Sequence, residues 1–132
     1  MRFVILLTLL CSFAFAQKSY QKNYFTNGQL ESAGWIKNGK KSGYWYYYHN
    51  NGKLKAEGHL KNDKKVKWWI FYDKNETINH KCQLKDGIKN GYCLMYQNEK
   101  LASAVKYSLG KKIKEWTDFK AFKKENRLRD LQ

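Results

Sequence analysis

Apolar and polar residues alternate along most of this chain, in short runs separated by turn-forming residues. Between residues 54 and 60 every second residue is apolar or glycine, and the residues between them are charged or polar. This period of two indicates a β-strand with one buried face and one exposed face. A polar turn at residues 61–65 follows, and the run Lys-Trp-Trp-Ile-Phe-Tyr at residues 67–72 predicts the returning strand of a hairpin.

The hairpin pattern recurs every 24 residues. The units fall near residues 24–47, 48–71, 72–95 and 96–119, and the last interval, from Tyr96 to Phe119, is 23 residues. Since a lone hairpin is marginally stable in water, stacked neighbours must stabilise each unit. We therefore predict an all-β fold, an elongated single-layer antiparallel sheet of about four hairpins, with residues 17–23 as a lead-in. The repeated positions are tyrosine (Tyr24, Tyr48, Tyr72, Tyr96), asparagine (Asn27, Asn51, Asn75, Asn98), leucine or isoleucine (Leu30, Leu54, Ile78, Leu101) and tryptophan (Trp45, Trp69, Trp116).

Residues 24–45 and 48–69 both follow the pattern Tyr-x-x-Asn-Gly-x-Leu-x-x-x-Gly-x-(Ile/Leu)-Lys-Asn-(Gly/Asp)-Lys-Lys-x-Gly-x-Trp, except that Lys67 replaces the last glycine. The pattern resembles the bacterial variant of the MORN repeat, found in proteins often labelled as the YwqK-type antitoxin family. Residues 24–119 carry the resemblance, which implies the same repeated-hairpin sheet. The label implies neutralisation of a partner toxin, and the MORN repeat implies binding to anionic lipid.

The two ends of the chain leave the repeat. Residues 1–16 combine Arg2, an apolar run and a small-residue site ending at Ala16, which predicts a secretory signal peptide cleaved near Ala16 and export to the periplasm, cell surface or medium. A lipid anchor at Cys11 and a retained N-terminal anchor are the alternatives. At the other end, Asp118 as N-cap and apolar residues at helical spacing predict a basic amphipathic helix over residues 120–132, capping the last hairpin. Glu125 precedes Arg129 by four residues, a spacing that favours an ion pair within that helix.

The two remaining cysteines occupy paired positions of the repeat. Cys82 stands where other units have Gly34 or Gly58, and Cys93 stands where they have tryptophan. If the turn centres on residues 87 and 88, Cys82 and Cys93 face each other, and elsewhere the same register lays a tryptophan over a glycine. We therefore expect a Cys82–Cys93 disulfide, consistent with export. A metal site of His80 with both cysteines, or two free thiols, are the alternatives.

Aromatic residues and lysines are the candidate binding groups. The 132 residues include 22 aromatic side chains, and 26 Lys+Arg against 11 Asp+Glu give a net charge of +15. Aromatic residues on both faces of the strands either replace a missing second layer or form a binding face. Lysines at the turns either keep the sheet soluble or form a stripe that attracts an anionic partner. The candidate surface comprises Tyr44, Tyr46, Tyr48, Trp68, Tyr72, Lys40, Lys41, Lys64 and Lys65.

The sequence contains no motif of a catalytic or cofactor site. It has no phosphate-binding glycine loop, nucleophile elbow or His-Glu-x-x-His, and its acids are scattered over turns and exposed positions. We therefore expect no enzyme activity, cofactor, bound metal or small-molecule substrate. The expected function is a protein-interaction module or scaffold at the bacterial cell envelope, with an unknown protein partner. A toxin neutraliser and a binder of anionic lipid or envelope polymer are the alternatives, and export disfavours nucleic acid.

Overall fold

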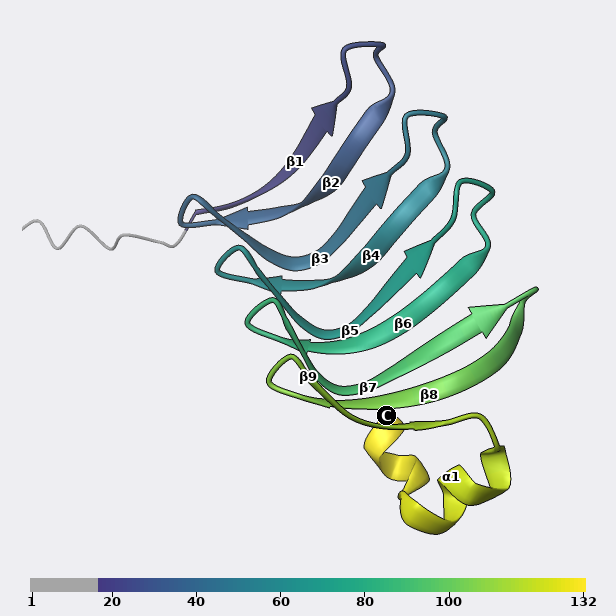
Figure 1. Cartoon of the computed structure of the whole chain (residues 1–132). Coiled ribbons are helices and arrows are strands. Elements are labelled where there is room, and N and C mark those ends of the chain that lie inside the picture. The colour runs from purple at the N-terminus through teal and green to yellow at the C-terminus, as the bar shows by residue number, and fades with distance from the viewer. Residues whose placement is uncertain (1–16) are drawn as a thin grey trace, which may run out of the picture.

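The computed structural model describes residues 17–132, which form one open antiparallel sheet of nine strands in chain order, followed by a short helix (Figure 1). The expected signal peptide, its cleavage near Ala16 and the alternative anchors lie outside the described residues. The elements are β1 (Lys18–Tyr24), β2 (Leu30–Lys37), β3 (Lys40–Tyr48), β4 (Leu54–Lys61), β5 (Lys64–Tyr72), β6 (Ile78–Lys85), β7 (Ile88–Gln97), β8 (Lys100–Ser108), β9 (Lys111–Trp116), the α-helix α1 (Phe119–Glu125) and the 3-10 helix η1 (Leu128–Leu131).

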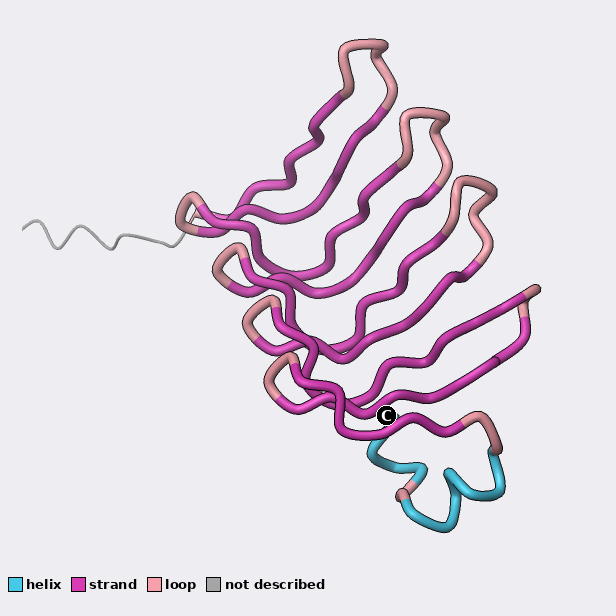
Figure 2. The backbone as a smooth tube through the Cα atoms, viewed as in Figure 1, coloured by secondary structure: helices cyan, strands magenta, loops and turns pink. Residues whose placement is uncertain are grey.

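The repeat units are the hairpins β2–β3, β4–β5, β6–β7 and β8–β9, so the predicted fold class is confirmed. Two-residue turns close these hairpins and form one row, at the left of Figure 2, while the turns that join one hairpin to the next lie on the other side. Asparagines link the joining turns: Asn27 Nδ2 donates to the carbonyl of Asn50, and Asn51 Nδ2 donates to that of Lys74. The 24-residue period therefore stacks equivalent turns on each other.

Residues 17–23, predicted only as a lead-in, contribute most of the additional strand β1. It pairs with β2 from Lys18 opposite Lys37 to Tyr24 opposite Leu30. Tyr20 packs edge-on against Trp35, with ring centroids 5.1 Å apart. Most side chains of β1 are exposed, so its sequence does not alternate between apolar and polar residues. This alternation is what predicts a strand from sequence, and its absence left β1 unpredicted.

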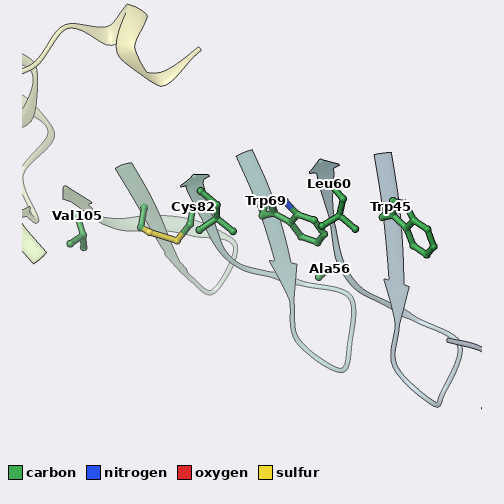
Figure 3. Packing of buried hydrophobic residues seen from close by; sticks show 8 residues of the cluster. Trp45, Ala56, Leu60, Trp69, Cys82 and Val105 are labelled. Atoms are coloured by element: carbon green, nitrogen blue, oxygen red, sulfur yellow. A yellow bond between two sulfur atoms is a disulfide. The ribbon is translucent and has the colours of Figure 1, made fainter. Parts of the chain in front are cut away.

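Consecutive strand residues point to opposite faces, and each face of the sheet has its own buried cluster. The first face, which we call the tryptophan face, carries side chains in a row across successive strands, and Figure 3 shows this row. Trp45 and Trp69 are fully buried over Gly34 and Gly58, as the predicted register requires. The cluster consists of Trp45, Ala56, Leu60, Trp69, Cys82, Leu84, Cys93 and Val105.

The opposite face, which we call the tyrosine face, carries the C-terminal cap. Phe122 of α1 is 3% exposed and packs edge-on against Tyr92 and Trp116 at 5.7 and 5.4 Å. Asp118 caps the helix as predicted, since its side chain accepts a hydrogen bond from the Lys120 amide. The helix thus covers one face of the last strands, and within residues 17–132 no helix has the length and apolar character to span a bilayer.

The predicted helix over residues 120–132 is too long. α1 ends at Glu125, and the side chain of its C-cap Asn126 donates back to the Phe122 carbonyl and accepts a 2.6 Å hydrogen bond from the Tyr92 hydroxyl. These bonds turn the chain into η1. Glu125 consequently pairs with Lys114 of β9, with 2.5 Å between Nζ and Oε2, and not with Arg129 as its spacing suggested.

Three residues that replace glycines of the repeat keep the backbone conformation of glycine. Lys67, Glu76 and Glu99 have φ values of 60°, 65° and 64°, in the left-handed region that Gly43 and Gly91 occupy at the position of Lys67. A side chain there costs about 1 kcal/mol. Lys67 lies where the register of β4 with β5 shifts, and Glu76 and Glu99 lie in the turns that follow β5 and β7.

Candidate binding surfaces

The fold divides the predicted candidate surface into three parts. Tyr44, Tyr46, Tyr48, Trp68 and Tyr72 lie on the tyrosine face, whereas the side chains of Lys41 and Lys65 lie over the tryptophan face. Lys40 and Lys64 are exposed at the two-residue turns. The nine residues therefore do not form one site.

On the tryptophan face, lysines cover the aromatic side chains. Lys41 Nζ lies 4.7 Å from the Trp45 ring centroid and donates to the Tyr47 hydroxyl, and Lys65 Nζ lies 5.0 Å from the Trp69 centroid. Burial, followed by the charges of Lys55 and Lys41, lowers the pKa of Lys65. Since these contacts already engage the ammonium groups, Lys41 and Lys65 stabilise the sheet in place of a second layer.

Exposed lysines flank the two-residue turns. Lys37 lies directly opposite Lys40, and Lys61 lies directly opposite Lys64. Like charges directly opposite each other in a sheet are destabilising, so stability does not explain these pairs. We call the row the lysine edge, and it comprises Lys37, Lys40, Lys61, Lys64, Lys85 and Lys111.

Within residues 17–132, no lysine of the lysine edge forms an ion pair with a carboxylate. The ion pairs among the described residues are Lys112–Glu115 and Lys114–Glu125, both near the C-terminus. Equivalent turns recur every second strand, which separates them by about 10 Å along the sheet. The six lysines outnumber the two acids of these turns, Asp63 and Asp86, so the edge is an extended row of net positive charge.

The tyrosine face holds one carboxylate that the sequence analysis had placed among scattered acids. Glu57 of β4 accepts hydrogen bonds from the Tyr44 hydroxyl at 2.7 Å and from the Tyr72 hydroxyl at 3.3 Å. Tyr46 is its cross-strand partner. The alternation of residues around Gly58 could have placed Glu57 on the face opposite the tryptophans. It could not have predicted the hydrogen bonds that Glu57 accepts from the two neighbouring strands.

Trp68 lies apart from these tyrosines. It packs against the cluster of Tyr92, Trp116 and Phe122, and with Leu131 of η1 it lines a shallow apolar hollow. We conclude that Trp68 helps to seat the C-terminal cap.

The environment of Glu57 alters the acidity of the tyrosines. Burial, the charge of Glu57 and the hydrogen bond to Glu57 raise the pKa of Tyr72 to about 12, and burial is also the main cause of the raised pKa of Tyr44 and Tyr48. Because a raised pKa favours the neutral phenol in the folded state, its contribution to stability is complete below pH 10 and is lost as the pH rises through 12. Titration of tyrosinate absorbance should therefore show a late-ionising group of tyrosines.

Glu57→Gln is the informative variant for this titration. We expect it to lower the pKa of Tyr44 and Tyr72 while burial keeps both above the ordinary value of 10.0. Simultaneous ionisation of all ten tyrosines in the folded protein would contradict the assignment.

Cys82 and Cys93 are cross-strand partners on β6 and β7 and are joined by a disulfide in the structure. The predicted turn centre at residues 87 and 88 is wrong by one residue, because the turn is formed by residues 86 and 87 and a bulge in the β6–β7 pair restores the pairing of the cysteines. Both are 1% exposed within the tryptophan face. His80 stacks on Phe71 with a 4.4 Å centroid distance, and among residues 17–132 no three His, Cys, Asp or Glu side chains are placed to share a metal ion. The geometry thus favours the disulfide over the alternative metal site.

Comparison with known proteins gives no assignment. No family model matches the sequence, no curated protein matches it, and no solved structure matches the fold. Function must therefore be argued from the lysine edge and the tyrosine face.

Proposed function

We propose that this chain is an exported, non-enzymatic repeat protein that acts as a protein-interaction module or scaffold at the bacterial cell envelope. The observation that carries the proposal is the lysine edge, where lysines oppose each other at the turns and form no ion pair among the described residues. The sequence features of a signal peptide support export.

An extended row of lysines suits an extended acidic partner. Rows of one charge steer an oppositely charged protein and set its register more than they set affinity. Equivalent lysines about 10 Å apart along the sheet would contact several acidic positions of one partner surface. We favour an acidic protein over nucleic acid because the chain carries an export signal, and the proposal includes no cofactor and no small-molecule substrate.

Charge reversal tests this proposal. The variant with Lys40→Glu and Lys64→Glu should lose the partner recovered by affinity capture from the native envelope fraction, with binding weakened roughly tenfold or more. The matched control is Lys53→Glu with Lys74→Glu, which makes the same charge change at exposed lysines of the opposite row of turns. Equal loss in both variants would indicate a non-specific charge effect and would contradict the proposal.

Two alternatives have distinct outcomes in related experiments. The resemblance to YwqK-type proteins favours an antitoxin, which a toxic enzyme captured in stoichiometric amount would support. The resemblance to MORN repeats favours anionic lipid or envelope polymer, which salt-sensitive co-sedimentation with anionic vesicles would support. Equal binding to neutral vesicles would count against lipid recognition through the lysine edge.

A further inference from the structure

We propose that the tyrosine face around Glu57 binds an organic ammonium group, with the Glu57 carboxylate facing the positive charge and Tyr44, Tyr46, Tyr48 and Tyr72 supplying aromatic rings. This site lies on strands β3 to β5, away from the turns that form the lysine edge. It is independent of the function proposed above.

The Glu57 carboxylate has a fixed position on the tyrosine face. Glu57 is held by two phenol hydroxyls, which orient both oxygens without neutralising the charge. The ion pairs of the described residues do not include Glu57, although the chain has 26 basic residues against 11 acidic ones. A fixed, half-buried carboxylate without an internal cation is a complement to an external one.

Lysines lie over many aromatic rings of the sheet, but not over the tyrosines around Glu57. Ten lysine–aromatic contacts occur in the described residues, on ten different rings. None of these contacts uses the four tyrosines around Glu57. A lysine therefore covers a ring on many strands of the sheet, but not beside the carboxylate, where a cation would gain most.

The tyrosine rings around Glu57 are inclined to one another. Tyr46 lies directly across from Glu57, and its ring meets that of Tyr44 edge-on at 5.1 Å. Tyr44 also meets His59 edge-on at 4.9 Å. Edge-to-face contacts leave ring faces at different orientations near one carboxylate, which suits a rounded cation.

The chemistry selects an organic ammonium over a metal ion. Calcium and magnesium require six or more oxygen ligands, whereas this surface offers one carboxylate and neutral phenols. Alkylated ammonium groups are weakly hydrated and bind to aromatic faces beside a carboxylate. A quaternary ammonium, as in choline, and a primary alkylammonium, as in a lysine side chain, share this chemistry.

The test is an NMR titration of the full mature chain at constant ionic strength. Choline and butylammonium are the two cationic probes, and 3,3-dimethylbutanol is the neutral probe with the shape of choline. We expect saturable shifts of the Tyr44, Tyr46 and Tyr72 signals with a millimolar dissociation constant for at least one cation. If choline binds more tightly, the natural ligand is a quaternary ammonium group, and if butylammonium binds more tightly, it is a primary alkylammonium group.

Variants separate charge from stacking. Glu57→Gln should weaken cation binding roughly tenfold or more. The control Glu99→Gln makes the same charge change in the turn between β7 and β8 and should leave binding unchanged. Tyr46→Leu, which keeps the carboxylate, should also weaken binding and serves as the second variant if Glu57→Gln unfolds.

The proposal is overturned by equal binding of the neutral probe, by the absence of saturable shifts with either cation, or by equal losses in Glu57→Gln and Glu99→Gln. None of these results bears on the lysine edge, because the charge-reversal variants there change other residues.

Discussion

Gly58→Ala is expected to lower the free energy of unfolding by about 3 kcal/mol, within the range of core substitutions that force a large side chain out of place. A Cβ atom at Gly58 would lie 2.5 Å from Cδ2 of Trp69. Trp69 cannot move aside easily, because it is fully buried and its Nε1 donates a 2.9 Å hydrogen bond to the His59 carbonyl. Urea or thermal denaturation of the two proteins measures the loss.

Gly87→Ala is the matched control. Its φ is +81°, so alanine there is strained, but among the described residues nothing lies within 4 Å of the added Cβ. We expect the control to lose only about 1 kcal/mol. Equal losses for Gly58→Ala and Gly87→Ala would mean that Trp69 is not seated on the glycine, and placing Gly58→Ala in a Trp69→Ala background should remove most of its effect.

The glycine–tryptophan pairing could be predicted from the sequence because the same turn and the same spacing recur in successive units. The turn at Asn62 and Asp63 pairs Lys61 with Lys64, and a β-bulge next to Gly58 then shifts the register so that Gly58 lies opposite Trp69. A register shift between Cys82 and Leu84 likewise brings Cys82 opposite Cys93, which the turn at Asp86 and Gly87 alone would not do. The periodic part of the fold is thus accessible because each unit repeats one local rule.

The parts without a repeat could not be predicted equally well. Strand β1 is largely exposed and gives no alternation, and the end of α1 depends on a hydrogen bond between Asn126 and Tyr92, which lies 34 residues earlier in the chain. Local sequence indicates where a helix begins through its N-cap. It does not indicate which distant side chain will turn the chain away.

The residues of the predicted candidate surface lie in separate parts of the sheet for a related reason. Lys40 and Lys41 look equivalent in sequence, yet alternation directs Lys41 over Trp45, while Lys40 stays exposed at the turn. Glu57 looked like one exposed acid among several, because its two phenol partners come from the strands on either side of β4. A group of side chains contributed by three strands can be recognised only after the register of those strands is known.

Replacing both Cys82 and Cys93 with serine is expected to lower the free energy of unfolding by about 3 kcal/mol. The disulfide closes a loop with a sequence separation of 11 residues, and loop-closure entropy for that length gives a value near this figure. Both side chains are 1% exposed, so the serine hydroxyls would also enter an apolar cluster. Denaturation with and without reductant should show a matching loss for the wild-type chain.

The exchange Cys82→Gly with Cys93→Trp is the sharper control, because it installs the pair found at Gly34 and Trp45 in the same register. If the two pairs are alternative ways to fill one position of the tryptophan face, this variant should recover most of the stability lost by the serine variant and should be insensitive to reductant. The reverse exchange, Gly58→Cys with Trp69→Cys, should form a new disulfide, and intact mass should fall by two hydrogen atoms on oxidation. Two free thiols in wild-type protein purified from an oxidising compartment, or unchanged stability of that protein on reduction, would contradict the disulfide and with it the equivalence of the two pairs.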